Sequence, residues 1–174
     1  MLSRLLVLLI LALGCSKPGT GEPFGAGGAG GDSSDFLVAP KVEVGVPGGE
    51  GGLDFFPLED GAELRLQTFG QGGTHLLVGV RCTGFGSRAF VSATLRNLST
   101  GVEVREPPPA SPQLLYCTEA EVCELVPYLV HASGLTEEPE ERDGLRVLLT
   151  ASVESREGAK AEASREVVLS TADL

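Results

Sequence analysis

The chain has 174 residues, a formal net charge of −11, 5% aromatic residues and no tryptophan. Such an excess of acidic side chains repels phosphate backbones and anionic lipid head groups, which argues against a nucleic-acid partner and against electrostatic membrane attachment. Half of the 24 glycines lie within residues 15–52, which leaves residues 53–174 as one domain of ordinary size.

The N-terminus begins with one basic residue, Arg4, followed by an apolar run over residues 5–13. A membrane-spanning helix needs about 20 apolar residues, so this run is too short to span a bilayer. A basic start, a short apolar run and a small residue at its end are typical of a secretion signal. We therefore expect residues 1–14 to be a signal peptide.

The sequence Ala12-Leu13-Gly14-Cys15 resembles the lipobox of bacterial lipoproteins. The resemblance implies that a peptidase cuts before Cys15 and that this cysteine becomes the lipid-carrying first residue. Two or more acyl chains anchor a protein stably, whereas one chain binds only marginally. The protein is thus expected to be lipid-anchored in the bacterial cell envelope, and Ser16 after the cysteine implies the outer membrane, facing the periplasm or the surface.

Residues 15–52 are rich in glycine and proline and show no sustained apolar period, which predicts a flexible tether. One apolar patch, residues 36–46, stands out within this range. It is interpreted as a transient edge strand that docks on the domain, with a short partner-binding segment as the alternative.

From residue 53 onward, apolar and polar residues alternate with a period of two, the pattern of half-buried strands. The alternation predicts strands at residues 62–66, 76–82, 89–95, 147–153 and 161–169. The last two flank a polar turn with one glycine and are expected to form a hairpin.

A further strand is expected within residues 122–130, where Pro127 confines it to a sheet edge or a bulge. A single helical turn over residues 118–126 is the alternative, because a Thr-x-x-Glu pattern begins there. Several short strands separated by turns predict an all-β fold. We expect an immunoglobulin-like antiparallel β-sandwich of about seven strands after a disordered N-terminal tether.

Two stretches carry a second resemblance, FFPLEDGAELRLQTFGQGGTHLLVGVR at residues 55–81 and LRVLLTASVESREGAKAEASREVVL at residues 145–169. Together they resemble a loose group of uncharacterised immunoglobulin-like lipoproteins from myxobacteria and their relatives. The resemblance implies the anchor, the sandwich and an envelope location. It supplies no known activity and no functional residues.

The stretch Gly-Gln-Gly-Gly-Thr-His at residues 70–75 is interpreted as a tight connection between two antiparallel strands. Gln71 and His75 beside this turn are the first candidates for a binding site. The other histidine is His131. A zinc site normally needs three or four suitably spaced ligands, and no such spacing is present, so neither a metal nor another cofactor is expected.

Once Cys15 is lipidated, three cysteines remain, and an exported protein meets oxidising conditions. Cys117 and Cys123 enclose five residues and are favoured as a disulfide, with a bridge that uses Cys82 as the alternative. Cys82 falls on the apolar side of its strand, where a thiol behaves as a small buried hydrophobe.

An acidic stretch at residues 136–143 is interpreted as a solvated loop, since its spacing fits no calcium-binding loop. No Gly-x-Ser-x-Gly motif is present, and a small sandwich has little room for a deep pocket, so no catalytic residue is assigned. The expected function is a non-catalytic, membrane-tethered module that binds an envelope protein or a glycan. The alternatives are a small periplasmic hydrolase that uses His75 or His131, and a calcium-stabilised structural module.

Overall fold

The computed structural model of the chain describes residues 39–69, 73–107, 109–118 and 121–171. The expected signal peptide, the expected lipidation site Cys15, the first part of the expected tether and Gln71 lie outside these described residues. Within them, the structure consists of β-strands and one short 3₁₀ helix. The elements are β1 (Lys41–Gly48), β2 (Asp54–Pro57), β3 (Ala62–Thr68), β4 (Thr74–Thr83), β5 (Arg88–Asn97), β6 (Glu103–Arg105), β7 (Gln113–Leu114), β8 (Tyr116–Cys117), β9 (Cys123–His131), η1 (Pro139–Arg142), β10 (Arg146–Glu154) and β11 (Lys160–Ser170).

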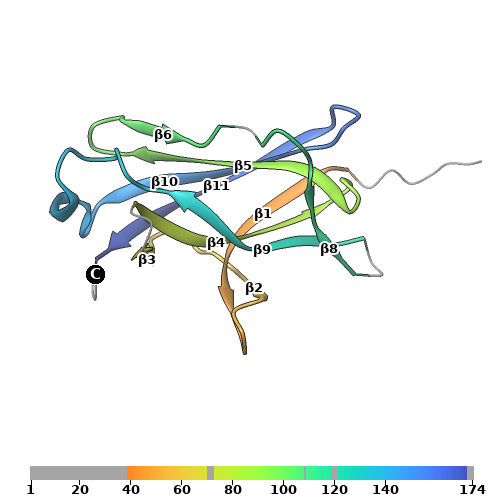
Figure 1. Cartoon of the computed structure of the whole chain (residues 1–174), viewed down its shortest axis with the longest axis horizontal. Coiled ribbons are helices and arrows are strands. Elements are labelled where there is room, and N and C mark those ends of the chain that lie inside the picture. Colours follow the sequence, from red (N-terminus) through yellow and green to blue (C-terminus); the bar gives the residue numbers. More distant parts are fainter. Residues whose placement is uncertain (1–38, 70–72, 108, 119–120, 172–174) are drawn as a thin grey trace, which may run out of the picture. The chain divides into compact units, whose positions relative to one another are not determined.

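The strands form two facing layers, seen edge-on in Figure 1. One layer contains β8, β9 and β4, and β4 pairs on its other side with β1 and β3; β2 extends this layer beyond β1. The other layer has the order β6-β5-β10-β11. Strand β3 joins the layers, because its first half runs parallel to β11 and its second half pairs antiparallel with β4.

This pairing order corresponds to the two sheets of an immunoglobulin-like sandwich. The predicted all-β fold is therefore confirmed. The structure differs in two details: eleven strand elements are described where about seven were expected, and the β3–β11 pair is parallel. The additional elements are short, since β2, β6, β7 and β8 have two to four residues each.

The core lies between the two layers and consists of the inward-facing positions of the alternating strands. Leu76 and Val78 of β4, Leu95 of β5, and Val147 and Leu149 of β10 belong to this core cluster, and all five residues are fully buried. These are positions that the period-two pattern placed on the apolar face. The hairpin of β10 and β11 is also as predicted, with Glu154 opposite Lys160 across the turn.

The boundary of the expected tether is corrected by β1. Residues 41–48 form a strand between β2 and β4 within the range 15–52 that was expected to be flexible. Val42 and Val44 of this strand are buried in the core. Of the two interpretations of the apolar patch, the docked strand is therefore the one that the described part of the patch adopts, and it is flanked on both sides.

The glycine content that suggested a tether has a packing role in β1. A Cβ atom added to Gly45 would lie 2.3 Å from the backbone oxygen of Phe56 and 2.5 Å from Cε2 of Phe55. Only a residue without a side chain permits this approach of β2. Composition alone cannot separate such a glycine from one in a flexible segment.

The helical turn considered for residues 118–126 is not formed over residues 123–126, because β9 begins at Cys123. Pro127 lies in β9 where the pairing with β4 shifts register between Val78 and Val80. The prediction of a bulge is confirmed. Within the described residues, no helix is long and apolar enough to cross a membrane.

Candidate functional site

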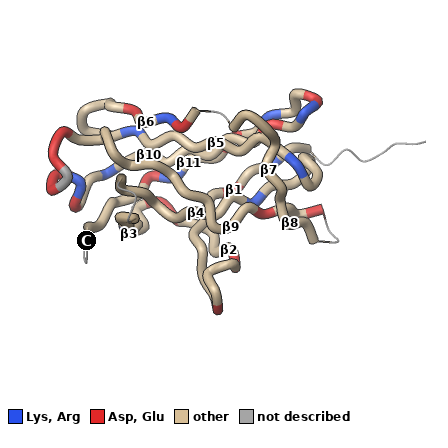
Figure 2. Tube along the Cα trace, in the orientation of Figure 1, with Lys and Arg blue, Asp and Glu red and all other residues tan. Residues whose placement is uncertain are grey.

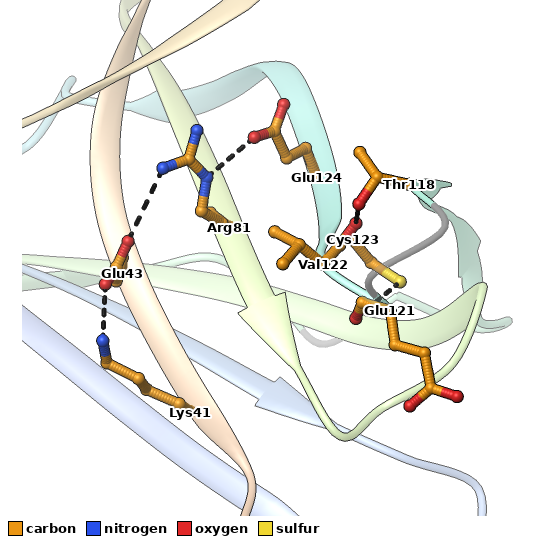
Figure 3. Close-up of polar contacts among 8 residues, drawn as sticks. All are labelled: Lys41, Glu43, Arg81, Thr118, Glu121, Val122, Cys123 and Glu124. Atoms are coloured by element: carbon orange, nitrogen blue, oxygen red, sulfur yellow. Dashed lines mark hydrogen bonds and ion pairs between the residues drawn. The ribbon is translucent and has the colours of Figure 1, made fainter. Parts of the chain in front are cut away.

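A row of charged side chains crosses three neighbouring strands on the outer face of the β1-β4-β9 layer. The strand register places Glu43 of β1 opposite Arg81 of β4, and Arg81 opposite Glu124 of β9. Arg81 Nε donates to Glu124 Oε1 at 2.7 Å, and Arg81 Nη1 lies 3.8 Å from Glu43 Oε2. Lys41 Nζ donates to Glu43 Oε1 at 2.6 Å and continues the row, as Figure 3 shows.

Arg81 makes a third contact in addition to its ion pairs with Glu43 and Glu124. Its guanidinium carbon lies 4.1 Å from the ring centroid of Phe55, which is buried. A cation over an aromatic face is attracted by the ring quadrupole. The hydrogen bond from Lys41 is the main cause that lowers the pKa of Glu43, with smaller contributions from the charges of Lys41 and Arg81. Glu43 therefore stays ionised at neutral pH.

A groove of about 470 Å³ lies along this row. One of its walls is the turn between β8 and β9, where Thr118 N donates to Val122 O at 2.9 Å. Figure 3 shows Thr118 and Val122 on this turn beside the charged row. The groove is lined by Lys41, Glu43, Arg81, Cys82, Thr83, Thr118, Val122 and Glu124.

The same turn carries the disulfide that was favoured from the sequence. Cys117 and Cys123 are bonded, and they close the turn from β8 into β9. Cys82 is the free cysteine of the described residues and lies opposite Cys123 in the strand register. Cys82 is 2% exposed, and burial raises the pKa of its thiol to about 11. The thiol therefore stays protonated at neutral pH, as expected of a small buried hydrophobe.

His75 and His131 meet at the other end of the same strand pair. They are register partners on β4 and β9, and His75 Nε2 lies 3.4 Å from His131 Nδ1. The two ring centroids are 5.0 Å apart, and Phe69 packs edge-on against His75 with centroids 5.5 Å apart. The sequence singled out His75 as a candidate, but the distance of 56 positions between the histidines gave no sign that they meet.

The tautomer of the pair follows from the surroundings of His75. Its Nδ1 is buried without a hydrogen-bond partner. A buried N–H without an acceptor is rarer and costlier than an unpaired acceptor. We therefore assign the shared proton to His75 Nε2, which donates to His131 Nδ1.

Glu106 lies beside this pair and was not singled out from the sequence. Its carboxylate accepts a 3.0 Å hydrogen bond from the backbone N–H of His131 and a 2.7 Å hydrogen bond from the hydroxyl of Tyr128. Burial, together with the nearby carboxylate of Glu106, raises the pKa of Tyr128. Among the described residues, neither histidine ring is hydrogen-bonded to a serine or a carboxylate.

The acidic stretch 136–143 forms a loop around η1 at one end of the sandwich, where acidic and basic residues lie close together (Figure 2). Arg142 turns inward from this loop and donates to Thr74 Oγ1 at 3.0 Å. Its side chain is buried, and this hydrogen bond holds the loop against the start of β4. In the described ranges, no group of three or more histidine, cysteine or acidic side chains is arranged to hold a metal ion.

Sequence reasoning found His75 and the cysteines but missed the charged row. Glu43, Arg81 and Glu124 all occupy outward positions of strands, which is the signal that the sequence does contain. Their alignment depends on the register of three strands that are far apart in the chain. Comparisons of the chain with protein-family models, with curated proteins and with solved structures find no match.

Proposed function

We propose that this protein is a non-catalytic binding module of the bacterial outer membrane, held there by lipid on Cys15, and that it binds another envelope protein in the groove beside Arg81. The observation that carries the proposal is the groove itself, bounded by a fixed row of alternating charges and by a disulfide-closed turn. Pre-organised side chains of this kind bind a partner without a large ordering cost.

The chemistry of the surface favours a protein over a glycan. Glu43, Arg81 and Glu124 are already paired with one another, so few of their donors and acceptors remain for sugar hydroxyls. Tyr116, opposite Glu124 in the register, is 72% exposed. Tyrosine and arginine are among the residues that dominate protein interfaces.

A site-specific photo-crosslinker tests this proposal in intact cells of the producing bacterium. We place the crosslinker at Val122 in the groove and, as a matched control, at Arg156 in the exposed turn between β10 and β11. We expect a discrete protein adduct from position 122, none from position 156, and loss of the adduct when Thr118→Arg fills the groove. The thermal midpoint of the Thr118→Arg protein shows whether it is folded. Equal adducts from both positions, or none from position 122, would overturn the groove as a binding site.

The lipid anchor has its own test. The wild-type protein should partition into the detergent phase and the Cys15→Ala variant into the aqueous phase, because acyl chains carry the membrane affinity. If the anchor positions the module for its partner, the adduct from position 122 should also disappear in the Cys15→Ala background. A wild-type protein that stays in the aqueous phase would contradict the lipid anchor. The crosslinking result at position 122 would still test the groove, because it does not require lipidation.

A further inference from the structure

We propose that His75 and His131 form a binding site for Zn²⁺ in which the two imidazoles supply two ligands and water fills the remaining positions. They are the two histidines of the chain, and the fold brings them together as register partners on β4 and β9. The site lies at the opposite end of these strands from the groove, so it does not depend on the proposed protein partner.

The separation of the two ring nitrogens fits this metal. Two nitrogens that are each 2.0–2.1 Å from a tetrahedral Zn²⁺ are about 3.3–3.4 Å apart. His75 Nε2 and His131 Nδ1 are 3.4 Å apart. Two adjacent nitrogens of a square-planar Cu²⁺ at similar bond lengths would be about 2.8–3.0 Å apart. The spacing of the two nitrogens therefore suits the tetrahedral ion.

Packing holds the rings in this arrangement. A Cβ atom on Gly73 would lie 3.2 Å from Cε1 of His75 and 3.3 Å from Cε1 of His131, so the backbone of Gly73 lies close against both rings. Gly73 also has φ of +88°, a conformation that L side chains rarely adopt. Phe69 packs edge-on against the ring of His75. A site whose ligands are held by packing loses little side-chain entropy when the metal binds.

The electrostatic surroundings also suit a cation. The Glu106 carboxylate accepts a hydrogen bond from the backbone N–H of His131, which places a negative charge next to this ligand. Metal binding at His75 Nε2 moves the ring proton to Nδ1, which is buried without a partner. This cost makes the site weaker than a closed structural zinc site with four protein ligands.

The experiment uses tag-free protein freed of metal by EDTA and then dialysed. Isothermal titration with ZnCl₂ should show one ion per chain, and His75→Gln and His131→Gln should each weaken binding by more than about tenfold. Glu157→Gln, at an exposed turn position, is the control for binding by surface carboxylates and should leave the affinity unchanged. Thermal melts in EDTA show whether each variant is folded.

Two measurements on the wild-type protein keep the test independent of the variants. The Cε1–H proton signals of both histidines should shift together and saturate at one equivalent of Zn²⁺. Co²⁺ in place of Zn²⁺ is paramagnetic and should strongly shift or broaden the same two histidine signals. Zn²⁺ binding that is equal in the wild-type and histidine variants, or histidine signals that neither Zn²⁺ nor Co²⁺ moves, would each overturn the site.

Discussion

The guanidinium of Arg81 lies 4.1 Å above the ring centroid of Phe55, so the charged row of the outer face rests on an aromatic side chain of the core edge. Phe55 belongs to β2 and Arg81 to β4, and β1 lies between these strands in the sheet. The contact therefore ties the N-terminal strands to the rest of the layer. It also explains why a half-exposed arginine keeps one position beside the groove.

Replacing Arg81 should cost more than replacing a solvent-exposed arginine. Arg81→Ala removes the cation–π contact and leaves the carboxylates of Glu43 and Glu124 without the cation between them. We expect the free energy of unfolding to fall by about 1–2 kcal/mol. Urea unfolding measures this, with Arg156→Ala as the matched control, which should change stability by less than about 0.5 kcal/mol. Equal effects of the two substitutions would show that the row is not structural.

The long strands of the two layers were predictable from the sequence because period-two alternation is a local signal. Val78, Leu95 and Leu149 each sit in such a run, and each is buried as the pattern requires. A local pattern does not determine which strands pair. The pairing of His75 with His131, and of Glu43 with Arg81, depends on register between strands, and the period of a strand carries no information about its neighbour.

The error at β1 has a different cause. Residues 41–48 alternate Val42, Val44 and Val46 with polar residues and glycine, yet they lie inside a glycine-rich range that reads as a tether. Composition averaged over the range outweighed the short alternation within it. Gly45 illustrates the problem, because its lack of a side chain serves close packing against β2.

Gly45→Ala should therefore destabilise the protein through overpacking. The added methyl group would meet the backbone of Phe56 and the ring of Phe55, and backbone atoms cannot move aside as a flexible side chain can. We expect a loss of about 1–3 kcal/mol in the free energy of unfolding. Gly51→Ala is the control, because its methyl group would have nothing within 4 Å and only its φ of +86° opposes the change. A loss at Gly45 no larger than at Gly51 would mean that β1 is not packed as described.

The disulfide between Cys117 and Cys123 closes a loop with a sequence separation of 6. Loop-closure entropy for so short a loop predicts a stabilisation of about 2 kcal/mol. The free energy of unfolding of the double variant Cys117→Ser/Cys123→Ser, measured in urea, should be lower than that of the wild type by about 2 kcal/mol. Adding reductant should lower the stability of the wild-type protein but leave that of the double variant unchanged. A reductant effect on the double variant would point to a different bridge.

The buried thiol of Cys82 predicts a loss of stability at alkaline pH. Burial raises its pKa from 9.0 to about 11 in the folded protein. Between these two values the unfolded chain loses the thiol proton while the folded chain keeps it, so the contribution is fully present below pH 9 and is lost as the pH rises toward 11. The thermal midpoint should fall more steeply over this window in the wild type than in Cys82→Ala. Parallel profiles would show that the thiol is accessible to solvent in the folded state.

The carboxylate of Glu106 can be tested through the tyrosine that donates to it. The pKa of Tyr128 is raised by burial first, and then by the hydrogen bond and the negative charge of Glu106. Glu106→Gln removes the charge but keeps an acceptor oxygen, so the pKa of Tyr128 should fall toward that of a free tyrosine without reaching it, since burial remains. Tyrosinate absorbance against pH, measured in a Tyr116→Phe background so that Tyr128 alone responds, gives the shift. A titration curve that Glu106→Gln leaves in place would mean that the carboxylate does not face the hydroxyl of Tyr128.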